Sequence, residues 1–218
     1  MTRHLYTLLA VCFAALSGTG AANAGVITVT GMQYANPTTV RISSASPAST
    51  SHVYAGAFTT TDGQDTFASW CVEIFQHTYF NSPVRDYFSV AGETILGEQK
   101  ADALSRLATE ALDQVTNSLT SGAFQIAVWE IVNERPGTSY NLSAGNFKAW
   151  GASNASITLA QHWLNNLPAT GNYTLEVLVS PTRQNLAVFS EVPEPGVLML
   201  FGLGLAAIGV SRRAKRKG

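Results

Sequence analysis

The chain has 218 residues and a formal net charge of −1, but its charges are unevenly distributed. Five of its thirteen Lys and Arg residues lie in the last seven positions, whereas residues 25–192 contain seven basic and thirteen acidic residues. This central part is therefore acidic and has no basic stripe, which argues against a nucleic-acid-binding protein. It is long enough for one domain with its own hydrophobic core.

The N-terminus has the three parts of a secretory signal. Arg3 supplies positive charge, and residues 5–16 form an apolar stretch that is too short to span a bilayer. Ala22-Asn23-Ala24 is a cleavage site of the small-x-small type. We therefore expect residues 1–24 to be a signal peptide and the mature chain to begin at Gly25.

The C-terminus also has three parts. Pro193-Glu194-Pro195 is followed by an apolar segment, residues 196–210, and then by a basic end that includes Arg212 and Arg213. By the positive-inside rule, such a segment stops in the membrane with its basic end in the cytoplasm. Its 15 residues are few for a permanent span, which needs about 20, and this shortness suits a segment that is removed after use.

This tail, residues 193–218, resembles the PEP-CTERM sorting signal of exported bacterial proteins. The resemblance implies a Gram-negative host, an inner-membrane intermediate and cleavage near the Pro-Glu-Pro motif by an exosortase. It further implies delivery to the outer surface or to the exopolysaccharide matrix of a biofilm. The alternative is an ordinary single-span anchor, which would also place the domain outside the cytoplasm.

Between the two ends, the pattern predicts an α+β fold that begins with a β-rich part. Small polar residues predict loops at 43–51 and 59–65. β-Branched and aromatic residues predict strands at 25–30, 39–42, 52–58 and 67–75. In the last of these strands, alternation places Trp70, Val72 and Ile74 on the core face. It places Cys71, Glu73 and Phe75 on the opposite face, with the thiol beside a carboxylate.

A helical middle and a C-terminal hairpin follow. Apolar residues at spacings of three and four predict a helix over 98–119, and a second one over 123–134 stops before Pro136. A third helix is expected within about 150–167, after which strands at 173–179 and 186–189 form the hairpin. Residues 87–96 are ambiguous. The order contains no βαβ repeat, so no parallel sheet is expected.

An unpaired cysteine is the most informative feature of the domain. The chain has two cysteines, and Cys12 falls in the expected signal peptide, so Cys71 has no disulfide partner in the mature chain. A free thiol outside the cytoplasm calls for a reason. Gln125 lies in an apolar run 54 positions later. A thiol and a carboxamide that are held together can lose ammonia and close into an internal thioester, provided that water is excluded.

Two short motifs strengthen this hypothesis. Trp70-Cys71-Val72-Glu73 and Phe124-Gln125-Ile126-Ala127-Val128-Trp129 resemble the two signatures of thioester domains in bacterial surface adhesins. The resemblance implies that Cys71 and Gln125 form the cross-link. The supporting residues would be Trp70, Glu73, Phe124, Ala127 and Trp129, with His77 as a candidate assistant in acyl transfer. Two features depart from the family: it often has Thr where this chain has Phe124, and its best-known members are attached to Gram-positive cell walls.

The leading hypothesis is therefore a covalent adhesin whose thioester reacts with an amine or a hydroxyl of a surface protein or polysaccharide. Each molecule would form one bond, so the protein is not expected to be an enzyme. One alternative is a passive structural or carbohydrate-binding matrix protein in which Cys71 is an inert buried residue. Another is a secreted hydrolase that uses Cys71 and His77. The spacing of Cys and His predicts no metal site, and no cofactor is expected.

Overall fold

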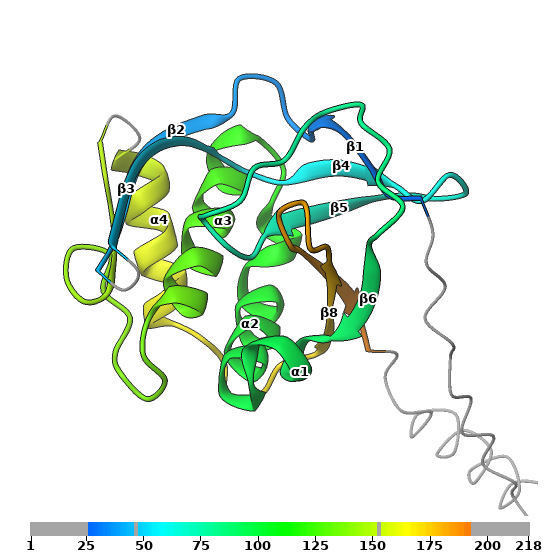
Figure 1. Cartoon of the computed structure of the whole chain (residues 1–218). Coiled ribbons are helices and arrows are strands. Elements are labelled where there is room, and N and C mark those ends of the chain that lie inside the picture. The colour runs from blue at the N-terminus through cyan, green and yellow to red at the C-terminus, as the bar shows by residue number, and fades with distance from the viewer. Residues whose placement is uncertain (1–25, 46–47, 152–153, 193–218) are drawn as a thin grey trace, which may run out of the picture.

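The computed structural model describes residues 26–45, 48–151 and 154–192 (Figure 1). The expected signal peptide and the tail, including Pro193, Glu194, Pro195, Arg212 and Arg213, lie outside these residues. The boundaries at 24 and 193 therefore stay predictions. Within the described part, no helix is long and apolar enough to cross a membrane.

The strands form two antiparallel sheets. The larger sheet has six strands in the order β1 (Thr28–Met32), β4 (Phe58–Thr61), β5 (Thr66–Cys71), β9 (Leu186–Glu191), β8 (Tyr173–Val179) and β6 (Phe88–Ala91). The smaller sheet has three strands in the order β3 (Ala48–Ala55), β2 (Thr38–Ala45) and β7 (Phe147–Trp150). The hairpin β8–β9 matches the predicted C-terminal hairpin.

The helices lie together beside these sheets (Figure 1). They are α1 (Gly92–Leu96), α2 (Glu98–Ala111), a short 3-10 turn at Leu112–Gln114, α3 (Ser118–Asn133) and α4 (Asn154–Asn165). Strands come first, the helices α1 to α4 follow with β7 among them, and a hairpin ends the domain. The predicted α+β class, with a helical middle and a C-terminal hairpin, is therefore confirmed.

Helix α3 is the centre of the domain. It packs against β2, β3 and β7 of the smaller sheet, against β5 of the larger sheet, and against α2 and α4. Every residue from Ser121 to Ile131 is buried. A helix that is covered on all sides has to be apolar around its whole circumference, which explains why the sequence of α3 shows no amphipathic stripe. The polar residues that α3 does bury are therefore conspicuous.

The helix boundaries differ from the prediction at Asn117. The first long helix was expected to continue to 119, but α2 ends at Ala111 and α3 begins at Ser118. Asn117, which falls inside the expected helix over 98–119, is the N-cap of α3: its side chain accepts hydrogen bonds from the backbone N–H groups of Leu119 and Thr120. The prediction was wrong because asparagine favours helix starts as well as turns.

Two further boundaries were wrong in the β-rich part. Residues 43–51 were expected to be a loop, yet they supply most of the hairpin β2–β3. Residues 59–65 were also expected to be a loop but include the end of β4. The third helix lies within the expected range but begins only at Asn154, and Trp150, at the start of that range, belongs to β7. Ser, Thr and Ala dominate both expected loops. Their weak strand signal was overridden by tertiary pairing with neighbouring strands.

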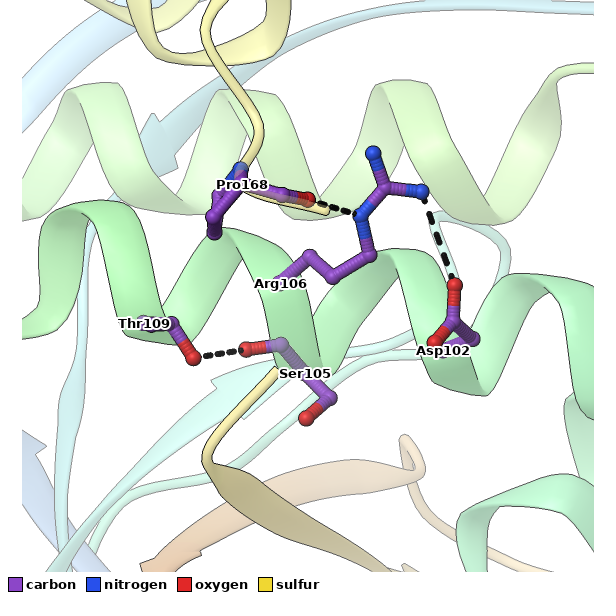
Figure 2. Close-up of polar contacts among 5 residues, drawn as sticks. All are labelled: Asp102, Ser105, Arg106, Thr109 and Pro168. Atoms are coloured by element: carbon purple, nitrogen blue, oxygen red, sulfur yellow. Dashed lines mark hydrogen bonds and ion pairs between the residues drawn. The ribbon is translucent and has the colours of Figure 1, made fainter. Parts of the chain in front are cut away.

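Side chains of helix α2 form hydrogen bonds with the connection between α4 and β8 and with the start of β8. The guanidinium Nε of Arg106 donates to the carbonyl oxygen of Pro168 at 2.5 Å, while Arg106 pairs with Asp102 at 3.5 Å and Thr109 bonds the carbonyl oxygen of Ser105 at 2.9 Å (Figure 2). A further bond joins the Ser105 hydroxyl to the carbonyl of Tyr173, the first residue of β8. These bonds hold the C-terminal hairpin, which pairs with the end of β5, against the helices.

Candidate functional site

The centre of the site is a paired hydrogen bond between Cys71 and Gln125. Cys71 is the last residue of β5, and Gln125 lies in the middle of α3. The backbone N–H of Cys71 donates to Gln125 Oε1 at 2.9 Å, and Gln125 Nε2 donates to the carbonyl oxygen of Cys71 at 2.9 Å. The two residues are 6% and 0% exposed. The buried carboxamide is thus held in one orientation against the peptide groups on both sides of the cysteine Cα.

This arrangement has features that acyl transfer to the cysteine would require. The Cys71 N–H withdraws electron density from the Gln125 carbonyl and lies where a negative oxygen would develop during attack, as donors do in an oxyanion hole. The carbonyl of Cys71 holds the amide nitrogen that would leave as ammonia. Both bonds involve the cysteine's own backbone, so the Gln125 carboxamide is positioned at the residue that carries the thiol.

A second glutamine, Gln184, accepts a hydrogen bond from the thiol. Cys71 Sγ donates to Gln184 Oε1 at 2.9 Å, and the Thr78 hydroxyl donates to the same oxygen at 2.9 Å. Gln184 Nε2 in turn donates to the carbonyl oxygen of Glu73 at 2.6 Å, and its own carbonyl oxygen accepts the Tyr87 hydroxyl at 2.6 Å. Gln184 is therefore a buried, fully bonded amide that orients the thiol.

Gln184 was not predicted as a site residue. It lies in the connection between β8 and β9, 113 positions from Cys71. A polar residue in a turn carries no pattern that distinguishes a buried ligand of a thiol from an exposed amide. Only the pairing of β5 with β9 brings the turn to the cysteine.

The strand alternation predicted for the cysteine was wrong. Strand β5 ends at Cys71, and the N–H of Val72 bonds the carbonyl oxygen of Asn185 rather than a strand partner. Trp70, Cys71 and Val72 are all buried, whereas Phe75 is 44% exposed. Residues on both faces are buried because α3 packs against β5 and the turn at Gln184 contacts its end. The thiol consequently faces the interior rather than a face opposite the core.

Burial has the largest effect on the pKa of the Cys71 thiol. It raises the pKa of Cys71 far above that of an ordinary cysteine, and the nearby Glu73 carboxylate raises the pKa further. The free thiol is therefore protonated at neutral pH and is a poor nucleophile towards reagents in solution. A thioester carries no charge and loses nothing by burial, whereas a thiolate released into this site would be strongly disfavoured.

The predicted supporting residues surround the pair, but in different ways. The Trp70 ring centroid lies 5.0 Å from that of Phe124 and 5.6 Å from that of Phe189, so these rings form an aromatic cluster next to the pair. Ala127 is fully buried in α3. Glu73 has a structural contact: its Oε1 accepts the N–H of Asn185 at 3.0 Å and so holds the turn that carries Gln184.

A pocket of about 360 Å³ leads to the cysteine. Most of its lining residues come from β3 and from the segment after β5, and others come from β1, β2, β4, α3 and the connection between β8 and β9; they include Cys71, Gln184 and Trp129. His77 lies in the pocket wall and is exposed. The indole N–H of Trp129 is buried and, within the described part of the chain, has no hydrogen-bond partner. Cys71 and Gln184 thus line a recess that a small group on another molecule can enter.

Neither a metal cluster nor a cysteine–histidine pair stands out in the described residues. Residues 26–45, 48–151 and 154–192 hold no group of three or more His, Cys, Asp or Glu that could bind a metal ion. The thiol donates its hydrogen bond to an amide oxygen instead of to a histidine ring. This geometry gives no support to activation of Cys71 by His77, which a cysteine hydrolase would need.

Comparison with known proteins identifies the tail. Residues 191–216 match the model of the PEP-CTERM protein-sorting motif. The chain carries a PEP-CTERM sorting signal. It is thus an exported protein that is sorted to the cell envelope, and the motif implies processing by exosortase-type sorting machinery.

One solved structure is similar to the domain. It is the N-terminal thioester domain of a surface protein from Clostridium perfringens, determined as a cysteine-to-alanine variant. The two structures have 16% sequence identity and a TM-score of 0.44, and the match covers 62% of this chain and 89% of the other. A similarity of this extent does not by itself assign a function. No curated protein matched the sequence.

Proposed function

We propose that this exported protein is a covalent adhesin or matrix-linking protein with an internal thioester between Cys71 and Gln125. The observation that carries the proposal is the pair of 2.9 Å hydrogen bonds between the Gln125 carboxamide and the peptide groups of Cys71. A buried glutamine could satisfy its hydrogen bonds with the backbone of many different residues. The Gln125 amide instead bonds the backbone of Cys71, whose side chain can take the acyl group.

The reaction has two steps. In the first, Cys71 Sγ attacks the Gln125 amide carbon, the C–N bond breaks, and the thiol proton leaves with the amide nitrogen as ammonia. In the second, an amine or hydroxyl of the target attacks the same carbon, the C–S bond breaks, and the sulfur recovers a proton. The product is an amide or ester that joins Gln125 to the target. Each molecule reacts once, so the protein is a reagent rather than an enzyme.

The surroundings support storage of the acyl group. Water is the competing nucleophile, and Trp70 and Phe124 keep the buried side of the site dry. Hydrolysis would also release a thiolate into an environment that strongly raises the pKa of Cys71. Both effects slow the loss of the thioester before a target arrives.

A second candidate is a passive structural or carbohydrate-binding matrix protein in which Cys71 stays a thiol. The hydrogen bond from Cys71 Sγ to Gln184 favours it, because a satisfied, buried and protonated thiol is chemically quiet. The two candidates differ in what happens to Gln125: it is consumed in the first and remains an amide in the second.

Methylamine separates the candidates. Because the described residues form one hydrophobic core, residues 25–192 are expected to fold without the two ends. A thioester in this protein would open and leave N-methylglutamine at position 125, which peptide fragmentation would locate. Gln125→Ala should lose the modification, and Gln184→Ala, the matched control at the same thiol, should keep it on Gln125. Absence of any adduct, or an adduct at Gln184, would refute the assignment.

A further inference from the structure

The pocket beside Cys71 restricts which nucleophile can reach the acyl group. Resting on the thioester proposed above, we propose that the target is a hydroxyl group of a neutral carbohydrate, which is captured as an ester, and that His77 transfers its proton. This assignment names the substrate class of the site, which was left open between amines and hydroxyls.

The pocket lining contains no Asp, Glu, Lys or Arg among the described residues. A lysine side chain arrives as an ammonium ion, and the pocket offers it no carboxylate to pair with. A sugar hydroxyl is neutral and enters without that penalty.

The pocket walls combine exposed aromatic rings with polar side chains. Tyr54 and Phe80, which are 67% and 49% exposed, contribute aromatic surface at the pocket, and Phe58 supports the Phe80 ring by an edge contact at 5.9 Å. Exposed aromatic rings that lie beside amide and hydroxyl groups suit a ligand with apolar C–H faces and a rim of hydroxyls. Gln76 and Thr78 supply such polar groups in the same lining.

The pocket wall contains a hydrogen-bond donor without a partner, the indole N–H of Trp129. The Trp129 side chain is 3% exposed and lines the pocket, and its indole N–H has no acceptor within the described residues. A buried donor without a partner is costly unless something fills the place. An oxygen atom on the reacting carbon or on the incoming sugar would fill it.

His77 lines the same pocket as Cys71 and Gln184. The hydroxyl of its neighbour Thr78 donates to Gln184 Oε1, the oxygen that also accepts the thiol hydrogen bond, so the segment that carries His77 is attached to the residue that orients the thiol. In the proposed step, the sugar oxygen attacks the thioester carbonyl carbon, which is the side-chain Cδ of residue 125, while its proton passes to His77. The C–S bond breaks, and the imidazolium returns this proton to the sulfur, which again donates to Gln184. No other reactant is required.

A neutral amine depends less on this transfer because it is already a strong nucleophile, whereas a hydroxyl needs a base. The expected signature is therefore a change in selectivity. In His77→Gln, the ratio of the coupling rate with sugar to that with methylamine should fall about tenfold or more. His162→Gln, which changes a histidine of α4 outside this pocket, should leave the ratio unaltered.

The test starts from residues 25–192 whose intact mass is one ammonia below the sequence value. This protein is incubated with maltotriose, with cellotriose, and with a peptide that contains one lysine and one serine. We expect a sugar ester at Gln125 that hydroxylamine releases. Coupling to the peptide but to neither sugar, or an unchanged ratio in His77→Gln, overturns the inference and leaves the thioester standing. A protein without the ammonia deficit contradicts the thioester itself.

Discussion

Glu130 gives the protein a stability that depends on pH. This residue of α3 is fully buried; its Oε1 accepts the N–H of Asn141 at 2.6 Å, whereas Oε2 is buried without a partner in the described part of the chain. Burial raises the pKa of Glu130 from 4.5 to about 7, against the opposing effect of the Asn141 N–H, and the negative Glu134 raises it further.

The sign and size of this pH dependence follow from the linkage between proton binding and folding. Because the pKa in the folded state is higher than in the unfolded state, the folded protein binds this proton more tightly. The resulting stability is fully present below about pH 4.5 and is lost as the pH rises through about 7. One pKa unit corresponds to about 1.4 kcal/mol, so the free energy of unfolding should fall by about 3 kcal/mol from this residue alone.

The perturbation is Glu130→Gln, which keeps the shape and removes the titration. Urea unfolding of both proteins should be measured between about pH 4 and pH 8, and the difference in the free energy of unfolding plotted against pH. Other titrating groups cancel in this difference. We expect the variant to gain about 3 kcal/mol relative to the wild type over that range. A difference that does not change with pH would refute the argument that Glu130 is buried in its protonated form.

Other substitutions test the packing around the site. Gly122→Ala should destabilise the domain by about 1–3 kcal/mol, because a Cβ there would lie 2.4 Å from the Thr38 side chain; thermal unfolding measures the loss, and an unchanged melting temperature would argue against this contact. Asn117→Ala should cost about 1 kcal/mol by removing the cap of α3, whereas Asn117→Ser should restore most of it. In Gln125→Ala, which keeps a free thiol, iodoacetamide should alkylate Cys71 far more slowly in the native state than in urea; equal rates would mean that the thiol is accessible.

The sequence predicts best those elements whose pattern is local. Alternation over residues 173–179 locates β8, and the apolar residues at 186–189 locate β9, because a hairpin needs only neighbouring segments. The spacing of Leu104 and Leu107 likewise identifies α2. The sequence pattern does not indicate strand pairing between distant segments. Strand β7 pairs with β2 across about a hundred residues, and nothing in the four residues of β7 predicts that pairing.

The same distinction holds for the site. Cys71 and Gln125 were selected from chemistry and from two short motifs, and the structure places their polar groups 2.9 Å apart. Their surroundings could not be derived, because the burial of the thiol depends on a turn from the far end of the domain and on a helix that is covered on all sides. Glu73 illustrates this limit: its carboxylate is near the thiol, as the sequence predicts, but it also accepts the N–H of Asn185 and so holds the turn that carries Gln184, which the sequence does not indicate.

The most direct test of the thioester is the intact mass of residues 25–192, purified at neutral pH without amines. We predict a mass that is lower than the sequence value by one ammonia molecule, and the full calculated mass for Cys71→Ala and for Gln125→Ala. Full mass in the unsubstituted protein, together with one thiol that titrates after unfolding, would contradict the proposal and leave Cys71 as a buried cysteine of a passive matrix protein.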